Sequence, residues 1–432
     1  MSTVLDNIHG TTGSAKSLAD RDREFVARPT TRIPVAVTGG DGAYLVDADG
    51  RRLLDLTSGW NVANTGWNHP RVVEAVVRQA RQMSFSPPWC THDGRSSVAE
   101  RLSDLLGGGY KALCGATGSE AVEAALKVAR RATGRQAIVG FTEAYHGGTL
   151  GSMQAGGVPQ LHAVDVPSTE FHRYAPIPDA LRSNGVDYAA ALREVLASGP
   201  APAAILLEPI FTNPGVIHGD AQFYAAVQQA ARDVGALIIM DEVGTGFGRT
   251  GHAFGFQHWG MDPDIVVVAK ALTSGAVPMA GALMKEDLSS AVAGPGFSST
   301  FGWVPLACAA AHASLDVISD EDLVARAATL GQRGLDRLSS LVAAYPSVAA
   351  IRGKGLEMGI EFTDESGKPF SRPPMENLTS RLLRRGIFAE PSSYTSTLLL
   401  MPPLVISDED WARALDAIEE EIADMTRKGE FQ

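Results

Sequence analysis

The segment from Pro263 to Gly275, PDIVVVAKALTSG, places one lysine directly after a short apolar run. The run, residues 265–269, is rich in β-branched side chains and shows no polar alternation. It therefore predicts a strand buried on both faces, as in a parallel sheet. Lys270 would then leave the sheet at its carboxyl edge, where open α/β sheets place their ligands. A lysine that ends a strand can also simply extend into solvent, so the interpretation depends on the surrounding motifs.

Lys270 has a defined chemistry if its amine lies in an apolar site. Burial disfavours the charged form and lowers the pKa of a lysine. A neutral lysine amine is a nucleophile that forms a Schiff base with a carbonyl group. The sequence therefore makes Lys270 a candidate catalytic residue.

The composition is that of an ordinary globular protein. The 432 residues are 45% hydrophobic and 20% charged, and the chain is long enough for a large domain and a smaller one. The formal net charge is −12 without basic runs, which argues against a nucleic-acid or anionic-membrane surface. The first residues lack a basic segment followed by an apolar run, so we expect no signal peptide, and no apolar stretch is long enough to span a bilayer. Cys90, Cys114 and Cys308 lack metal-ligand spacing. We expect a cytoplasmic protein that acts on a small molecule and binds no metal.

The hydrophobic pattern predicts a hairpin followed by alternating strands and helices. The hairpin covers residues 35–56 and has an Asp-Gly turn between Asp47 and Gly50. The alternation then predicts an α/β fold with a parallel sheet. Predicted helices cover residues 71–83, 119–134, 223–235, 305–318, 320–344, 374–385 and 408–426, and predicted strands cover 136–141, 203–209, 236–243, 355–362 and 397–406.

The change in element order near residue 325 predicts a domain boundary. We expect an N-terminal segment, residues 1–70, that contributes to a small domain, a large domain over residues 71–325, and a C-terminal small α+β domain over residues 326–432.

Two motifs supply candidate partners for Lys270. Asp241 follows an apolar strand, and a carboxylate there is costly to bury without a cationic partner. A turn rich in Gly, Thr and Ser leads into the helix that begins near Ser119, and the free N–H groups of such a helix end form a site for a phosphate. Either feature alone also fits an ordinary strand end or an ordinary helix cap.

Loops rich in aromatic and polar residues complete the candidate pocket. Trp60 lies in the segment TSGWNVANTGWNHP, and Trp89 lies in FSPPWCTHD. The segment TEAYHGG brings Tyr145 and His146 to the edge of the sheet. Histidines in such loops are more often structural than catalytic.

A glycine pattern downstream of Asp241 does not indicate a nicotinamide site. Gly246, Gly248 and Gly251 formally match the G-x-G-x-x-G fingerprint. A true fingerprint opens a helix, but the residues that follow Gly251 have no helical periodicity. We therefore reject this interpretation.

Together, the segments ATGSEAVEAALKVAR, AYHGGTLGS, LIIMDEVGTGFGRTG, PDIVVVAKALTSG and RGKGLEMGIEF resemble the class III aminotransferase family of pyridoxal-phosphate enzymes. The resemblance covers nearly the whole chain. It implies fold type I, with a mainly parallel seven-stranded sheet flanked by helices and a small α+β domain. It also implies pyridoxal 5'-phosphate as the cofactor and a homodimer with shared active sites.

The resemblance assigns a role to each matching residue. Lys270 matches the lysine that forms the Schiff base, and Asp241 matches the carboxylate that pairs with the pyridinium nitrogen. Thr300 matches a threonine that reaches the phosphate of the neighbouring subunit. The remaining cofactor-binding candidates are Gly118 and Ser119 in the phosphate turn, Tyr145 and Val243 on the two ring faces, and His146 and Glu208.

Three positions depart from the family pattern. Gly244 stands where the family often has a glutamine, and Leu399 and Asn213 replace an arginine and a glutamate of glutamate-using members. We therefore expect a pocket lined by Trp60, Trp89 and Leu399 that prefers an amine or an amino acid with an apolar or aromatic part. An arginine from elsewhere, such as Arg249 or Arg95, could replace the lost cation.

Lys270 and Asp241 suit an aminotransferase that moves an amino group between an amine or amino acid and a carbonyl acceptor. The same pair would also serve an amino-acid racemase or epimerase, a decarboxylase, an aminomutase or a carbon–carbon bond-forming enzyme. A cofactor-binding protein without turnover is an alternative from another class. A regulator built on this fold would need an appended DNA-binding segment, and the acidic chain shows none.

Overall fold

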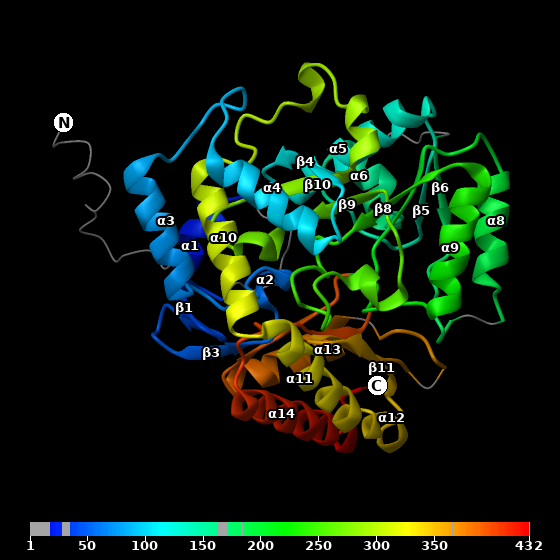
Figure 1. The fold of residues 1–432 in the computed structure, drawn as a ribbon. Coiled ribbons are helices and arrows are strands. Elements are labelled where there is room, and N and C mark those ends of the chain that lie inside the picture. The colour runs from blue at the N-terminus through cyan, green and yellow to red at the C-terminus, as the bar shows by residue number, and fades with distance from the viewer. Residues whose placement is uncertain are drawn as a thin grey trace.

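The computed structural model describes residues 18–27, 35–162, 171–182, 185–364, 366–370 and 372–431. A seven-stranded sheet forms its centre (Figure 1). Strand β10 runs antiparallel to both neighbours, and the remaining neighbours pair in parallel. In spatial order the strands are β4 (Tyr110–Gly115), β10 (Ala280–Lys285), β9 (Ile265–Val268), β8 (Leu237–Asp241), β7 (Ala204–Leu207), β5 (Ile138–Phe141) and β6 (His172–Ala175).

The sheet is buried on both faces, which explains the apolar run before Lys270. Ile265 and Val267 pack in a cluster with residues of α5 (Gly118–Thr133). Val266 and Val268 belong to a second cluster, which includes residues of α9 (Ala221–Val234) and α10 (Pro305–Asp320). The mainly parallel α/β sheet that the sequence predicted is therefore confirmed.

Two further sheets have four strands each, and one of them joins the two ends of the chain. One has the order β1-β2-β3-β13, and the other has the order β11-β12-β15-β14. Strand β3 pairs in parallel with β13, so the N-terminal hairpin joins the C-terminal part. The strands are β1 (Val37–Asp41), β2 (Tyr44–Asp47), β3 (Arg52–Asp55), β11 (Val348–Lys354), β12 (Glu357–Phe362), β13 (Ile387–Phe388), β14 (Glu390–Pro391) and β15 (Thr397–Leu400).

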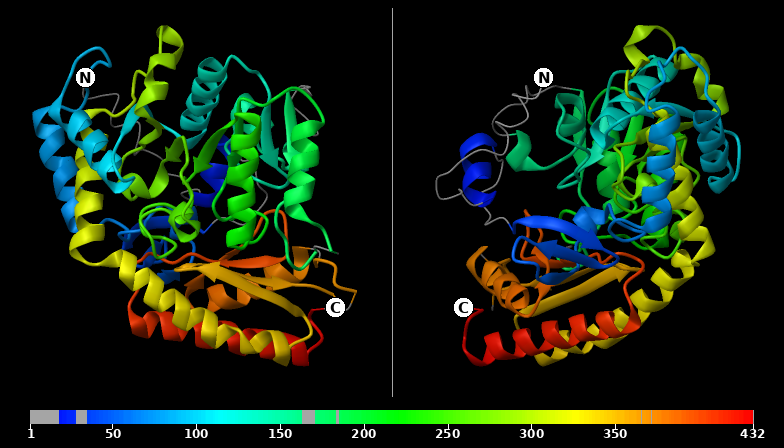
Figure 2. Two further views of the ribbon diagram at one scale, coloured as in Figure 1. Left: turned by 45° about the vertical axis from the view of Figure 1, so that its right-hand side comes forward. Right: turned by 90° about the vertical axis from the view of Figure 1, so that its left-hand side faces the viewer.

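We refer to the sheet β11-β12-β15-β14 as the C-terminal sheet. Helices near the C-terminus cover the side of this sheet that faces away from the seven-stranded sheet (Figure 2). These are α11 (Leu323–Leu338), α12 (Ser340–Ala344), α13 (Arg372–Arg384) and α14 (Asp408–Arg427). The other helices that frame the fold are α1 (Leu18–Phe25), α3 (Pro70–Gln82), α4 (Asp93–Leu105), α6 (Leu150–Ala155), α7 (Pro159–His162) and α8 (Tyr188–Ala197).

Most predicted elements are present, with three differences. The hairpin around Asp47 to Gly50 is confirmed, but β1 adds a third strand to it. The helix predicted over residues 320–344 is divided into α11 and α12. The strand predicted over residues 397–406 ends at Leu400, because Pro402 and Pro403 follow and proline cannot donate to a ladder. The division of the chain into domains stays a prediction.

Candidate active site

Lys270 lies where the buried strand β9 ends. It opens a short 3-10 helix, Lys270–Thr273, with a positive φ of 45°. The neighbouring strand β8 runs in parallel, with Asp241 opposite Val267. The carboxylate and the lysine therefore leave the sheet at the same edge, because parallel strands end together.

Asp241 has an ordered hydrogen-bonding environment although it is almost fully buried. One carboxylate oxygen lies 2.7 Å from His146 Nδ1, and the other accepts the backbone N–H of Val243 at 3.0 Å. The second ring nitrogen of His146 is buried and has no partner among the described residues. Asp241 is thus held in one orientation by an imidazole behind it.

Glu208 and Asp241 place negative charge near the Lys270 amine. Burial raises the pKa of Glu208 to about 7, while hydrogen bonds from the backbone of Tyr145 and Thr212 favour its charged form. Burial lowers the pKa of Lys270, and the charges of Asp241, Glu208 and Glu357 oppose that effect. A lysine with a lowered pKa has a larger neutral fraction and is the better nucleophile.

The first turn of α5 borders the same cavity. Its N-cap is Thr117, whose side chain accepts the N–H of Glu120 at 3.2 Å, and Ser119 Oγ accepts the N–H of Gly148 at 3.0 Å. The first N–H groups of a helix have no partner within the helix, so those of Gly118 and Ser119 are available to an anion.

These groups meet in one cavity of about 430 Å³. Nine of the predicted site residues line it: Trp60, Gly118, Ser119, Tyr145, His146, Glu208, Asp241, Val243 and Lys270. We refer to Ser119, His146, Glu208, Asp241 and Lys270 as the sheet-edge wall.

Leu399 is placed elsewhere, so that expectation is corrected, whereas the role of Trp89 stays a prediction. Leu399 has an exposed fraction of 0%, since β15 buries it among Ile210, Val216 and Met401. Trp89 is 83% exposed and lies outside the cavity of this chain.

Three further predicted residues also lie outside the cavity lining. Thr300 is exposed, and the cavity of its own chain does not include it. Arg249 is fully buried and donates hydrogen bonds to the carbonyls of Leu356 and Pro402, so its guanidinium is part of the protein interior and does not face the cavity. Arg95 donates to the Cys90 carbonyl at 2.9 Å. The structure of this chain therefore shows no replacement for the missing arginine among the described residues that line the cavity.

Asn61, Thr212 and Glu357, which the sequence did not single out, join Trp60 on or just behind another part of the cavity lining. Helix α2 (Ser58–Asn61) is a left-handed turn, in which Ser58, Gly59, Trp60 and Asn61 all have φ between 43° and 70°. Asn61 donates from Nδ2 to Glu357 Oε1 at 3.3 Å. We refer to Trp60, Asn61, Thr212 and Glu357 as the turn wall.

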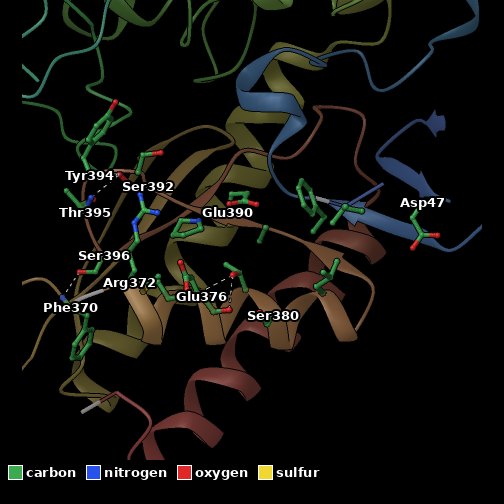
Figure 3. A pocket seen from close by; sticks show the side chains of 18 of the residues that line it. Asp47, Phe370, Arg372, Glu376, Ser380, Glu390, Ser392, Tyr394, Thr395 and Ser396 are labelled. Carbon is green, nitrogen blue, oxygen red and sulfur yellow. Dashed lines mark hydrogen bonds between the residues drawn. The ribbon is translucent and has the colours of Figure 1, made fainter. Parts of the chain in front are cut away.

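A larger cavity of about 700 Å³ lies apart from these groups (Figure 3). Figure 3 shows Glu376 and Ser380 on α13, and Ser392, Tyr394 and Thr395 on the segment that follows β14. None of the predicted site residues lines it. Size alone therefore does not identify the active site, because the chemistry lies in the smaller cavity.

Within the described residues, no cluster of His, Cys, Asp or Glu could hold a metal ion. Over the same part of the chain, no helix has the length and apolar character required to cross a membrane.

The sequence profile of the aminotransferase class-III family matches residues 25–422, and the chain belongs to this family. It is 35% identical to a diaminobutyrate–2-oxoglutarate aminotransferase of Rhizobium meliloti over 88% of this chain and 86% of the relative. It is 34% identical to an acetylornithine aminotransferase of Methanosarcina mazei over 94% and 96% of the two chains. The protein is accordingly a pyridoxal-phosphate-dependent aminotransferase of fold type I.

Solved structures agree with this assignment. A Bacillus anthracis aminotransferase superposes with a TM-score of 0.90 at 28% identity, covering 98% of this chain and 99% of the other. An amine transaminase from an uncultivated Pseudomonas species, in its PLP-bound form, gives a TM-score of 0.86 at 29% identity, covering 92% and 97%.

The residues of the cavity fit the cofactor that this family uses. The free N–H groups at the start of α5 suit its phosphate, and Asp241 suits a protonated ring nitrogen. A Cβ on Gly147 would lie 2.4 Å from Ser119 Oγ, so glycine at 147 is needed for the close approach of the two loops. His146, a buried group with one unpartnered nitrogen, supports the carboxylate from behind.

Proposed function

We propose that this chain binds pyridoxal 5'-phosphate in the 430 Å³ cavity, with Lys270 as the covalent attachment residue and Asp241 as the partner of the ring nitrogen. The observation that carries the proposal is the convergence of Lys270, Asp241 and the first turn of α5 on one cavity. When bound, the cofactor carries the amino group and withdraws electrons from the substrate carbon.

The residues of the cavity have separate tasks in this proposal. The N–H groups of Gly118 and Ser119 bind the phosphate, and Thr300 of a second copy of the chain adds a hydroxyl. Tyr145 and Val243 pack on the two ring faces. Asp241, oriented by His146, keeps a proton on the ring nitrogen, because a buried carboxylate stabilises an adjacent cation.

Lys270 is the proton carrier at the substrate carbon. Once the substrate amine has displaced it, its side chain is a free amine with a lowered pKa. A base whose pKa lies closer to the working pH exchanges protons efficiently with its substrate.

Borohydride reduction followed by peptide mapping tests the attachment residue. Reduction of the full-length enzyme should fix the cofactor on the peptide that contains Lys270. The control is Lys285→Ala, because Lys285 pairs with Asp262 on the surface and its loss should leave the label in place. A label on any other lysine would contradict the assignment.

A homodimer is part of the proposal. Trp89 and Phe301 are 83% and 65% exposed, and such large apolar side chains are usually covered by a partner. We also propose a cytoplasmic location, in keeping with the three free cysteines. Light scattering at assay concentration checks the dimer, and a fully active monomer would overturn it.

We infer that the amino donor is an amine or an amino acid with an apolar or aromatic part. Trp60 lines the cavity, and Lys270 is the only lysine or arginine among the described lining residues. The two relatives are named for other substrates: one for diaminobutyrate and 2-oxoglutarate, and the other for acetylornithine.

A further inference from the structure

Glu357 is a buried carboxylate just behind the cavity. It is the first residue of β12, and its exposed fraction is 0%. Its Oε1 accepts hydrogen bonds from Thr212 Oγ1 and from Asn61 Nδ2. Its Oε2 has no partner within the described part of the chain, and neither does the side-chain oxygen of Asn61. A buried carboxylate with one free oxygen needs a reason to be retained, since its burial is costly.

Of the two residues that Glu357 binds, Thr212 lines the cavity and Asn61 lies directly behind the lining residue Gly244. Thr212 lines the cavity together with Lys270 and Gly244. A Cβ built on Gly244 would lie 3.5 Å from Thr212 Oγ1 and 3.7 Å from Asn61 Nδ2. The polar ends of Thr212 and Asn61 thus pack against Gly244, and Glu357 lies one side chain behind the wall.

Charged groups from several elements act on the Lys270 amine. Asp241 ends β8, Glu208 follows β7, and Glu357 begins β12, and all three favour the protonated lysine. The charges of Arg249 and Lys270 in turn favour the ionised form of Glu357, against burial, which raises the pKa of Glu357 to about 6. Glu357 is thus ionised at neutral pH and is the only one of the three carboxylates on the C-terminal sheet.

We propose that Glu357 is a positioning residue for Lys270, which acts on the lysine amine through its buried negative charge and through the cavity wall that it fixes. The proposal rests on Lys270 being the reactive amine of the proposed function. Both carboxylate oxygens of Asp241 have partners, in His146 and the backbone of Val243, whereas Oε2 of Glu357 has none within the described part of the chain. Glu357 therefore supports the amine whenever the lysine is released from its covalent partner.

The chain offers a matched control in Glu242. This carboxylate also has an exposed fraction of 0%, and burial raises its pKa to about 7. It accepts from Thr245 Oγ1 and from the backbone of Gly255 and Phe256. It is not among the charges that act on Lys270. Glu242→Gln therefore removes an equally buried charge without touching the proposed effect.

The test is pH-dependent acylation of the full-length chain after removal of the cofactor, read out by mass spectrometry of the Lys270 peptide. Acetic anhydride reacts only with the neutral amine, so the midpoint of labelling reports the protonation of Lys270. Glu357→Gln should shift this midpoint down by about 1 pH unit. Glu357→Asp keeps the charge, so its midpoint should lie close to that of the wild type. Glu242→Gln should leave the midpoint unchanged.

An unchanged midpoint in Glu357→Gln would overturn the proposal, and so would an equal shift in Glu242→Gln. If Glu357→Gln does not fold, Glu357→Met replaces it, because it also removes the charge and has a similar side-chain volume, and it should lower the midpoint in the same way. Thr212→Val leaves the carboxylate in place but deletes one of its hydrogen bonds, so it should move the midpoint less than half as far as loss of the charge. The labelling requires no cofactor, whereas the borohydride experiment does, so the two proposals fail separately.

Discussion

The two walls of the cavity are built in different ways. The sheet-edge wall consists of side chains that follow regular strands and the first turn of a helix, such as Asp241 after β8. The turn wall depends on α2, where Ser58, Trp60 and Asn61 are non-glycine residues with positive φ. Each such residue costs about 1–2 kcal/mol relative to a right-handed conformation, so contacts elsewhere must offset the strain.

Arg249 provides those contacts. It donates to Ser58 Oγ at 3.0 Å, at the start of the strained turn, and to Asn64 Oδ1 at 2.7 Å, just after the turn. The comparison shows that regular secondary structure positions the sheet-edge wall, whereas long-range contacts shape the turn wall. Changes to the sheet-edge wall should therefore affect chemistry directly, whereas changes to the turn wall should affect stability, substrate choice and, at Glu357, the protonation of Lys270.

Lys270→Ala should have the largest effect. Turnover should fall by on the order of 10³-fold or more, because both the covalent attachment and the proton carrier are lost. The free energy of unfolding should change little or rise, since a buried amine is removed. Steady-state kinetics and thermal unfolding measure the two quantities. Turnover within tenfold of the wild type would show that the sheet-edge wall does not depend on this amine.

Arg249→Met should break the turn wall. The change leaves the carbonyls of Leu356 and Pro402 and two side-chain oxygens without a buried donor, so the free energy of unfolding should fall by about 4 kcal/mol. Turnover measured well below the melting temperature should fall as well, because α2 relaxes.

The control for Arg249→Met is Arg135→Met. Arg135 also donates to backbone carbonyls, those of Pro202, Val234 and Gly235, but it lies outside the cavity lining. Its loss should lower stability and leave turnover intact. Equal turnover in the two variants would contradict a specific role of Arg249 in the turn wall.

The fold was predictable where the sequence carried a strong local signal. Strands β7, β8 and β9 are short apolar runs without alternation, and they lie close to the predicted positions. Strand β10 (AGALMK) was not predicted, since glycine and alanine have a low strand propensity and its place between β9 and β4 is set by packing. Strand β11 was missed as well, because its half-exposed residues show no clear period.

The residues of the candidate site also differ in whether the local sequence predicts their place. Lys270 and Asp241 follow apolar runs, so their burial could be predicted from neighbouring residues. Asn61, Thr212 and Glu357 are brought together from three distant segments, and no local pattern records that contact. The sequence did contain one signal for Glu357. It lies in the apolar segment GLEMGIEF, and a carboxylate in such a segment is costly to bury, as it is at Asp241. Leu399 shows the converse, because an apolar residue near a pocket can pack beneath it.

Glu242 allows the cost of a buried carboxylate near the sheet-edge wall to be measured. Burial raises its pKa from an ordinary value of 4.5 to about 7. Between these values the folded protein holds a proton that the unfolded chain releases, so wild-type stability falls as pH rises through this window. Relative to that of Glu242→Gln, the free energy of unfolding of the wild type should fall by about 3 kcal/mol between pH 4.5 and pH 7. Urea unfolding at both pH values measures this difference, and a constant difference would refute the buried-carboxylate interpretation.

The smallest effect concerns the donor, which tests whether the turn wall selects substrates. A dicarboxylate such as glutamate brings a charge that must be matched inside the cavity, and an unmatched buried charge costs several kcal/mol. Lys270 is the only lysine or arginine among the described lining residues. In the proposed function its amine attaches the cofactor and carries the proton, so it does not pair with a substrate carboxylate. Leu399 lies beneath the surface and offers no charge. We therefore expect glutamate to convert the bound cofactor at least about tenfold more slowly than an aromatic amine such as phenylethylamine, which corresponds to about 1.4 kcal/mol. Single-turnover spectroscopy of the cofactor with a panel of donors makes the measurement. Conversion by sub-millimolar glutamate as fast as by the best donor would show that a cation outside this cavity lining binds the carboxylate and that the turn wall does not exclude it.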